Sequence, residues 1–143
     1  GALKEVDNND PKSARAILLN IRKTLNDLRR RNNLYVLADC IFEINQAMPA
    51  LWRYRKSPPD LTVAEEGLQM VGAAAVYVDR VRRCKSIAPA QVRSSPEFSR
   101  LIDGAIESLS HIPRAAETRD GALLLRVIRE LKSIDTLLFF RFG

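Results

Sequence analysis

The sequence contains few of the residues that build catalytic centres or disulfide-rich folds. Its 143 residues include one histidine and two cysteines, and the cysteines, Cys40 and Cys84, stand in separate apolar segments. Metal sites need three or four converging ligands, and small secreted domains need several disulfides. We therefore expect no metal and no cofactor, and we interpret both cysteines as reduced, unbridged thiols in the core.

Glycine, proline and long apolar runs are also scarce. Only six glycines and seven prolines occur, so the prolines act as breaks between longer segments. The apolar runs fall far short of the roughly 18 residues that a bilayer span needs, which excludes a membrane-spanning helix. With 46% hydrophobic and 28% charged residues, the composition is typical of a soluble globular protein.

What the sequence does contain is apolar residues that recur with the period of an α-helix. Asp10 as N-cap and Pro11 at the first helical position begin the first such segment. We expect a helix over 11–31, closed by Asn32 and Asn33. Four further helices are expected over 34–48, about 63–84, 96–112, and from about residue 120 onward.

Local signals indicate where these helices begin and end. Pro49 should end or kink the second helix, because proline lacks the backbone N–H of a helix interior. Thr62 and Glu65 have the spacing of a capping box at the start of the third. The stretch 85–95 is expected to be a loop, and Pro113 should end the fourth helix.

These elements predict an all-α fold. No segment alternates with period two for long, so we expect no sheet. Helices joined by mostly short loops favour an antiparallel bundle of about five helices, with two to three stacked helical hairpins, solenoid-like, as the alternative. We expect a polar lead-in over 1–10 and a single helical domain over 11–143, which a longer protein could contain.

No group of residues indicates catalysis. His111 follows Glu107 by one helical turn, and one histidine cannot provide the paired Glu-x-x-His ligands of a bundle metal site. The remaining close carboxylates have no convergent partner and fit a solvated helix face; they are Asp39 with Glu43, and Glu65 with Glu66. A glycine-rich phosphate loop is also missing, so we expect a protein that is not an enzyme and has no catalytic residues.

The net charge of +6 is carried mainly by arginine, whose guanidinium suits phosphate and carboxylate. Arg15, Arg22 and Arg29 recur every seven residues along the flank of the first helix, a spacing that could follow a phosphate backbone. The candidate phosphate contacts are these three with Arg30, Arg31, Arg80, Arg82 and Arg83. The alternative is that the clusters stabilise helix C-termini. Nearby aromatic residues that could stack on bases are Tyr35, Trp52 and Tyr54.

The last helix carries more apolar residues than one core-facing side can use. On a helical wheel, Leu125, Leu137 and Phe140 fall outside the main apolar sector. Exposed apolar groups of this kind mark an interface. The predicted partner interface comprises Leu125, Leu137, Phe139, Phe140 and Phe142, and its partner would be another protein chain or a second copy.

Together these patterns favour a protein that acts by binding. The first hypothesis is a non-enzymatic scaffold or adaptor subunit of a larger, nucleic-acid-associated assembly, with RNA or DNA as a candidate partner. The alternative is a purely protein-binding helical bundle that docks on an acidic partner or a membrane-complex surface. No targeting segment is visible, and we expect an intracellular location, with an organelle as one option.

Overall fold

The computed structural model describes residues 10–32 and 35–143, and its regular secondary structure in those ranges is all helical, with no strand. This confirms the predicted all-α class. The chain divides into two compact units, Gly1–Val36 and Leu37–Gly143, which we describe separately. The expected lead-in lies outside the described residues except for Asp10, so the division at residue 10 stays a prediction.

The first unit contains one long helix, α2 (Pro11–Arg31). Asp10 caps it as predicted: its carboxylate accepts hydrogen bonds from the Ser13 hydroxyl at 2.7 Å and from the Ser13 backbone N–H at 3.2 Å. These bonds, the hydroxyl first, hold the pKa of Asp10 below its ordinary value. At the other end the Asn32 side chain donates to the Leu28 carbonyl, whereas Asn33 lies outside the described residues.

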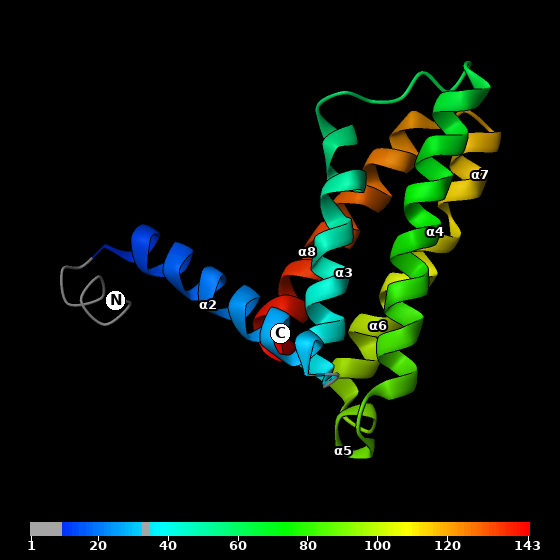
Figure 1. Ribbon diagram of the computed structural model, residues 1–143. Helices are drawn as coiled ribbons and strands as arrows, with labels where there is room; N and C mark the ends of the chain where they lie inside the picture. The colour runs from blue at the N-terminus through cyan, green and yellow to red at the C-terminus, as the bar shows by residue number, and fades with distance from the viewer. Residues whose placement is uncertain (1–9, 33–34) are drawn as a thin grey trace. The chain divides into compact units, whose positions relative to one another are not determined.

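The second unit is an antiparallel four-helix bundle (Figure 1). Its four long helices run in alternating directions. The first and third long helices each contact the second and the fourth, so helices that are adjacent in sequence are also neighbours in space. The long helices are α3 (Leu37–Trp52), α4 (Ala64–Ile87), α6 (Pro96–Ser110) and α8 (Gly121–Phe142).

Short helical turns connect the long helices: η1 (Arg53–Arg55), α5 (Ala90–Arg93) and α7 (Ile112–Glu117). The stretch 85–95, expected to be a loop, is therefore partly helical, because α4 continues to Ile87 and α5 follows it. The fourth expected helix ends at Ser110, and Pro113 lies in the first turn of α7, where its missing N–H costs no hydrogen bond.

The structure differs from the sequence-based expectation at two helix ends. The second helix does not end at Pro49: α3 continues to Trp52, because Met48 and Leu51 on either side are fully buried and hold the last turn in the core. The capping box does not form either. Instead, the Thr62 hydroxyl donates to the Asp60 carboxylate, and Val63 precedes α4 without a side-chain cap.

The core of the bundle is mainly apolar. Its largest fully buried side chains come from all four long helices and from α7, and they include Ile41, Met48, Met70, Ile102, Ile112 and Leu131. No helix in the described part of the chain is both long enough and apolar enough to cross a membrane.

A disulfide joins Cys40 of α3 to Cys84 of α4. Both side chains are buried, as expected for core cysteines, but the prediction that they are reduced and unbridged was wrong. Their Cα atoms lie 5.5 Å apart, which is within the usual range for a disulfide. The packing of α3 against α4 brings the two thiols together although they are 44 positions apart in sequence.

Candidate binding surfaces

The strongest polar cluster in the bundle joins three helices through the Asp135 carboxylate of α8. The Tyr77 hydroxyl of α4 donates to Asp135 Oδ1 at 2.7 Å. The Asn45 amide of α3 donates to Asp135 Oδ2 at 2.8 Å. Burial raises the pKa of Asp135 above its ordinary value, against the lowering effect of these two bonds, and burial also raises the pKa of Tyr77.

The cluster contains groups that could perform acid–base chemistry, but a substrate cannot reach them. Asp135 is only 1% exposed and Tyr77 is 0% exposed, so a substrate has no route to either oxygen. Both carboxylate oxygens already accept a hydrogen bond from the protein. The cluster therefore serves to align α3, α4 and α8, since a buried carboxylate requires its partners in place.

The predicted interface on α8 separates into open and covered residues. Leu137 is 44% exposed and Phe140 is 74% exposed, whereas Leu138 between them is fully buried. Phe142 packs edge-on against Phe98 of α6, with 5.2 Å between ring centroids, so this side chain serves the bundle itself. Leu125 and Phe139 are half-buried.

An ion pair holds the last turn of α8 in place. Arg141 Nε lies 3.3 Å from Glu97 Oε1 of α6, and this contact acts beside the Phe98–Phe142 ring contact. The two contacts attach the C-terminal turn to α6. Leu137 and Phe140 therefore lie next to a helix end that contacts α6.

The candidate phosphate contacts on α4 do not form one open cluster. Arg80 is half-buried and donates through Nη1 to the Glu43 carbonyl oxygen of α3 at 2.6 Å. Arg83 Nη1 lies 3.9 Å from Glu43 Oε2, whereas Arg82 is exposed. Two of the three arginines are thus directed to α3 by the helix packing.

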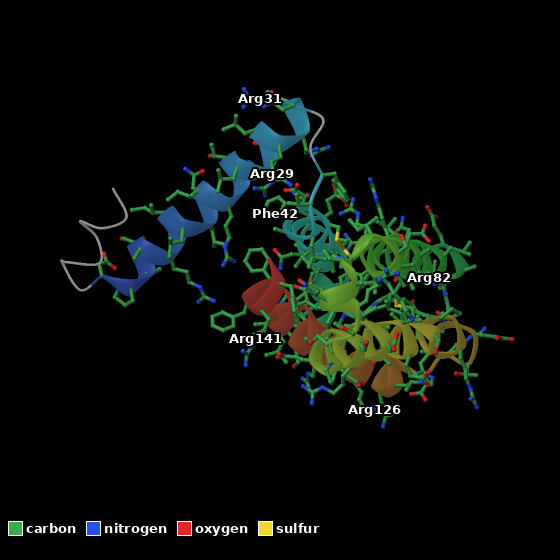
Figure 2. The ribbon with its side chains drawn as sticks, turned by 90° about the horizontal axis from the view of Figure 1, so that it is seen from below. Arg29, Arg31, Phe42, Arg82, Arg126 and Arg141 are labelled. Atoms are coloured by element: carbon green, nitrogen blue, oxygen red, sulfur yellow. A yellow bond between two sulfur atoms is a disulfide. The ribbon has the colours of Figure 1, made fainter. Side chains whose placement is uncertain are left out.

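Basic side chains of the bundle are spread around its outside, as Figure 2 shows, with Arg82 on α4 and Arg126 on α8 as labelled examples. The other candidate arginines belong to α2, in the first unit. There Arg15, Arg30 and Arg31 are exposed, and Arg22 and Arg29 are half-buried. The α2 and α4 candidates therefore belong to different units.

Cationic side chains of the second unit lie over the rings of Trp52 and Tyr54, two of the predicted base-stacking residues. The Arg55 guanidinium lies 4.4 Å from the centre of the Trp52 ring, and Lys132 Nζ of α8 lies 5.7 Å from it. Tyr54 is buried, and Arg53 donates to its hydroxyl at 2.9 Å. The third candidate, Tyr35, belongs to the first unit and is half-buried.

Sequence reasoning did not identify Lys132 as part of this group. Nothing in the sequence indicates the pairing, because Lys132 and Trp52 are 80 positions apart and meet only through the packing of α3 against α8.

A pocket of about 440 Å³ opens beside this group. It is bounded by Arg53 and Tyr54 of η1, by the 57–59 loop, and by Glu66 and Gln69 of α4. The Glu66 carboxylate accepts a hydrogen bond from the Asp60 backbone N–H, so it helps to hold the loop. The mixed charge of the walls favours no one class of ligand.

The acidic pairs and the histidine do not converge. Asp39 is buried and Glu43 is next to Arg83, while His111 Nε2 and Glu107 Oε1 are 3.7 Å apart on an exposed surface. Across residues 10–32 and 35–143, no three histidine, cysteine, aspartate or glutamate side chains are placed to hold a metal ion. Comparison of the chain with protein-family models, curated proteins and solved structures found no match.

Proposed function

We propose that this chain is a non-enzymatic helical adaptor that binds another protein chain within a larger assembly. The observation that carries the proposal is the exposure of Leu137 and Phe140 on the well-anchored end of α8. The disulfide further favours an oxidising compartment, such as an organelle lumen.

The physical argument rests on the apolar area that these two side chains leave in water. Burying a leucine or phenylalanine side chain contributes about 1.5 to 3 kcal/mol. Leu131 and Leu138 already anchor α8 in the core, and both are fully buried. Leu137 and Phe140 are therefore not needed by the bundle, and a partner that covers them would gain that free energy.

The test replaces both residues with serine. Leu137→Ser/Phe140→Ser should abolish self-association or a partner complex, measured by sedimentation and pull-down, and should leave the midpoint of thermal unfolding within a few degrees. The control is Leu68→Ser/Val76→Ser on α4, which removes equally exposed apolar groups from another face and should leave association unchanged.

The opposite pattern would refute the proposal. If the α8 variant unfolds at a clearly lower temperature and associates normally, Leu137 and Phe140 serve the fold rather than a partner.

A second candidate is association with RNA or DNA, which the net charge of +6 and the arginine row of α2 favour. Neutralising Arg15, Arg22 and Arg29 with glutamine should then flatten the salt dependence of nucleic-acid binding by up to roughly 2 to 3 units of log–log slope. Neutralising Arg100, Arg114 and Arg126, which are exposed on the second unit, is the control with the same change in charge. Equal slopes for the two variants would eliminate a specific role for the α2 row.

A further inference from the structure

Two cations of the second unit lie over the single ring of Trp52. The Arg55 guanidinium carbon is 4.4 Å from the ring centre, and Lys132 Nζ is 5.7 Å from it. The quadrupole of the ring attracts each cation, and Arg55 also donates through Nη1 to the Trp52 carbonyl oxygen at 3.3 Å. All three residues are half-buried. Trp52 therefore keeps two positive charges close together at the surface.

Helix α8 adds a third cation to this group. Arg129 precedes Lys132 by three residues, so the two side chains lie on one side of the helix, with Cβ atoms about 5 to 6 Å apart. Arg129 is exposed, and the Lys132 contact shows that this side of α8 lies next to Trp52. We call Trp52, Arg55, Arg129 and Lys132 the Trp52 cluster.

The surroundings of the Trp52 cluster bring little negative charge to the surface. Positions 44–59 contain no aspartate or glutamate, and Glu130 of α8 lies about 160° round the helix from Lys132. Burial raises the pKa of Asp135, and Lys132 is among the groups that oppose the rise. The Asp135 carboxylate is only 1% exposed, however, and both its oxygens accept hydrogen bonds, so it cannot serve as a surface partner.

The three cations of the cluster are therefore ready to accept an anion. In the described part of the chain, none of them forms an ion pair. Positive charges this close repel one another, and the repulsion is screened less at half-buried positions than in open solvent. A ligand that brings carboxylates or phosphates would relieve it.

We infer that the Trp52 cluster binds an acidic peptide segment of a protein partner, extended and with carboxylates at alternate positions. Side chains two residues apart in an extended peptide lie about 6 to 7 Å apart on one face, close to the spacing of Arg129 and Lys132. Arg55 can hold a carboxylate through two N–H groups, whereas Lys132 offers a point charge. The inference rests on the proposed protein-binding function but uses a surface other than the apolar end of α8.

The same geometry disfavours a nucleic acid as the occupant. Proteins that bind single strands stack bases on aromatic faces, whereas cations of the protein itself lie over the Trp52 ring, and Tyr54 is buried. A nucleic acid would gain only backbone contacts here. A peptide carboxylate needs no aromatic face, so it can use every charge that the cluster offers.

Trp52 is the only tryptophan of the chain, so its fluorescence reports directly on the cluster. The full chain is titrated at low ionic strength with a short peptide, blocked at both ends, that carries three glutamates separated by single serines. We expect a saturable change in Trp52 emission and at least about tenfold tighter binding than that of the glutamine counterpart. Added salt should weaken the binding of the glutamate peptide.

Substitution of the cations, followed by isothermal titration, tests the assignment to the cluster. Arg55→Gln/Lys132→Gln should lower the affinity for the glutamate peptide at least about tenfold. The matched control is Arg100→Gln/Arg114→Gln, which makes the same change in net charge at exposed positions elsewhere on the second unit. It should keep the affinity within about twofold.

A second variant covers the case in which loss of Lys132 disturbs the buried carboxylate beneath it. Arg55→Gln/Arg129→Gln leaves Lys132 in place. This variant should also lose at least about fivefold in affinity, and its midpoint of thermal unfolding should match that of the wild type.

Five results would overturn the inference. They are equal binding of the glutamate and glutamine peptides, an affinity that both cluster variants retain, an equal loss in the control, tighter binding of a uridine tetranucleotide with the same three negative charges, and a gain of about tenfold in Glu5→Gln/Asp7→Asn. The fourth would make a nucleic acid the occupant, and the last would make it the chain's own acidic residues. Leu137→Ser/Phe140→Ser should bind the peptide normally, so its association tests the proposed function alone.

Discussion

The Asp135 carboxylate makes the stability of the bundle depend on pH. Its pKa is raised above the ordinary value of 3.8, chiefly by burial. The folded state therefore holds the proton more tightly than the unfolded state does. Above the raised pKa the buried charge lowers the free energy of unfolding, and this cost disappears once pH falls below the ordinary value.

Replacing Asp135 with asparagine should remove that cost. The asparagine amide can donate to the Tyr77 oxygen, and its carbonyl can accept from Asn45, so each contact keeps one hydrogen bond, with the direction of the Tyr77 bond reversed. At pH 7 the variant should be more stable than the wild type by up to about 2 kcal/mol, and the difference should vanish near pH 3.5. Urea denaturation at a series of pH values measures it.

The matched variant at the same position is Asp135→Ala, which leaves the Tyr77 hydroxyl and the Asn45 amide without their acceptor. It should cost about 2 to 4 kcal/mol at pH 7. If the asparagine variant were equally destabilised, the carboxylate charge itself would be contributing to stability, and the burial argument would fail.

The backbone conformation of Arg119 leads to a second prediction at the residue scale. It has a φ of 56° and follows α7, where the Asp120 N–H bonds to the Ala115 carbonyl and the Arg119 N–H bonds to that of Ala116. This is a Schellman motif, in which the left-handed residue is usually glycine.

Arg119→Gly should therefore raise the free energy of unfolding, by up to about 1 kcal/mol. Thermal or urea denaturation measures the gain. Arg114→Gly, in the interior of α7, is the control and should destabilise by about the same amount. A loss of stability in both variants would indicate that the Arg119 side chain, rather than its backbone, matters at this turn.

At the scale of helices, the Cys40–Cys84 disulfide is the one covalent link between α3 and α4 beyond the chain itself. Closing a loop of this length reduces the entropy of the unfolded chain and contributes about 2 to 4 kcal/mol. Reduction should lower the midpoint of urea denaturation accordingly. In guanidinium without reductant, a thiol reagent should detect no free thiol.

The double variant Cys40→Ala/Cys84→Ala is the control for this experiment. Its stability should not respond to reductant, and it should lie close to that of the reduced wild type. Two titratable thiols in the untreated protein would show that the pair is reduced, as the sequence-based interpretation held.

At the scale of the whole molecule, the periodic pattern was enough to predict five long helices, because apolar residues recur every three to four positions in each of them. Their ends were harder to predict. Pro49 opposes helix continuation locally, and the burial of Met48 and Leu51 overrides it. Where a local preference and the burial of side chains favour different helix ends, tertiary packing decides, and the sequence pattern does not contain that information.

The candidate site was less predictable than the fold. Asn45, Tyr77 and Asp135 come from three helices, and their convergence depends on the order of helices around the bundle. The one available signal was Asp135 itself, a carboxylate on the same helix face as Leu131 and Leu138. The exposure of Leu137 and Phe140, in contrast, follows from the helical wheel alone and is observed.

The disulfide also determines what a single cut in the backbone does to the protein. Lys56 is exposed, directly after η1, and a trypsin-like protease that cleaved there would separate α3 from α4 in sequence. Cys40 lies before that cut and Cys84 after it, so the two pieces would remain one covalent molecule. The bundle could thus persist as a two-chain protein, with α3 on one chain and the other long helices on the second.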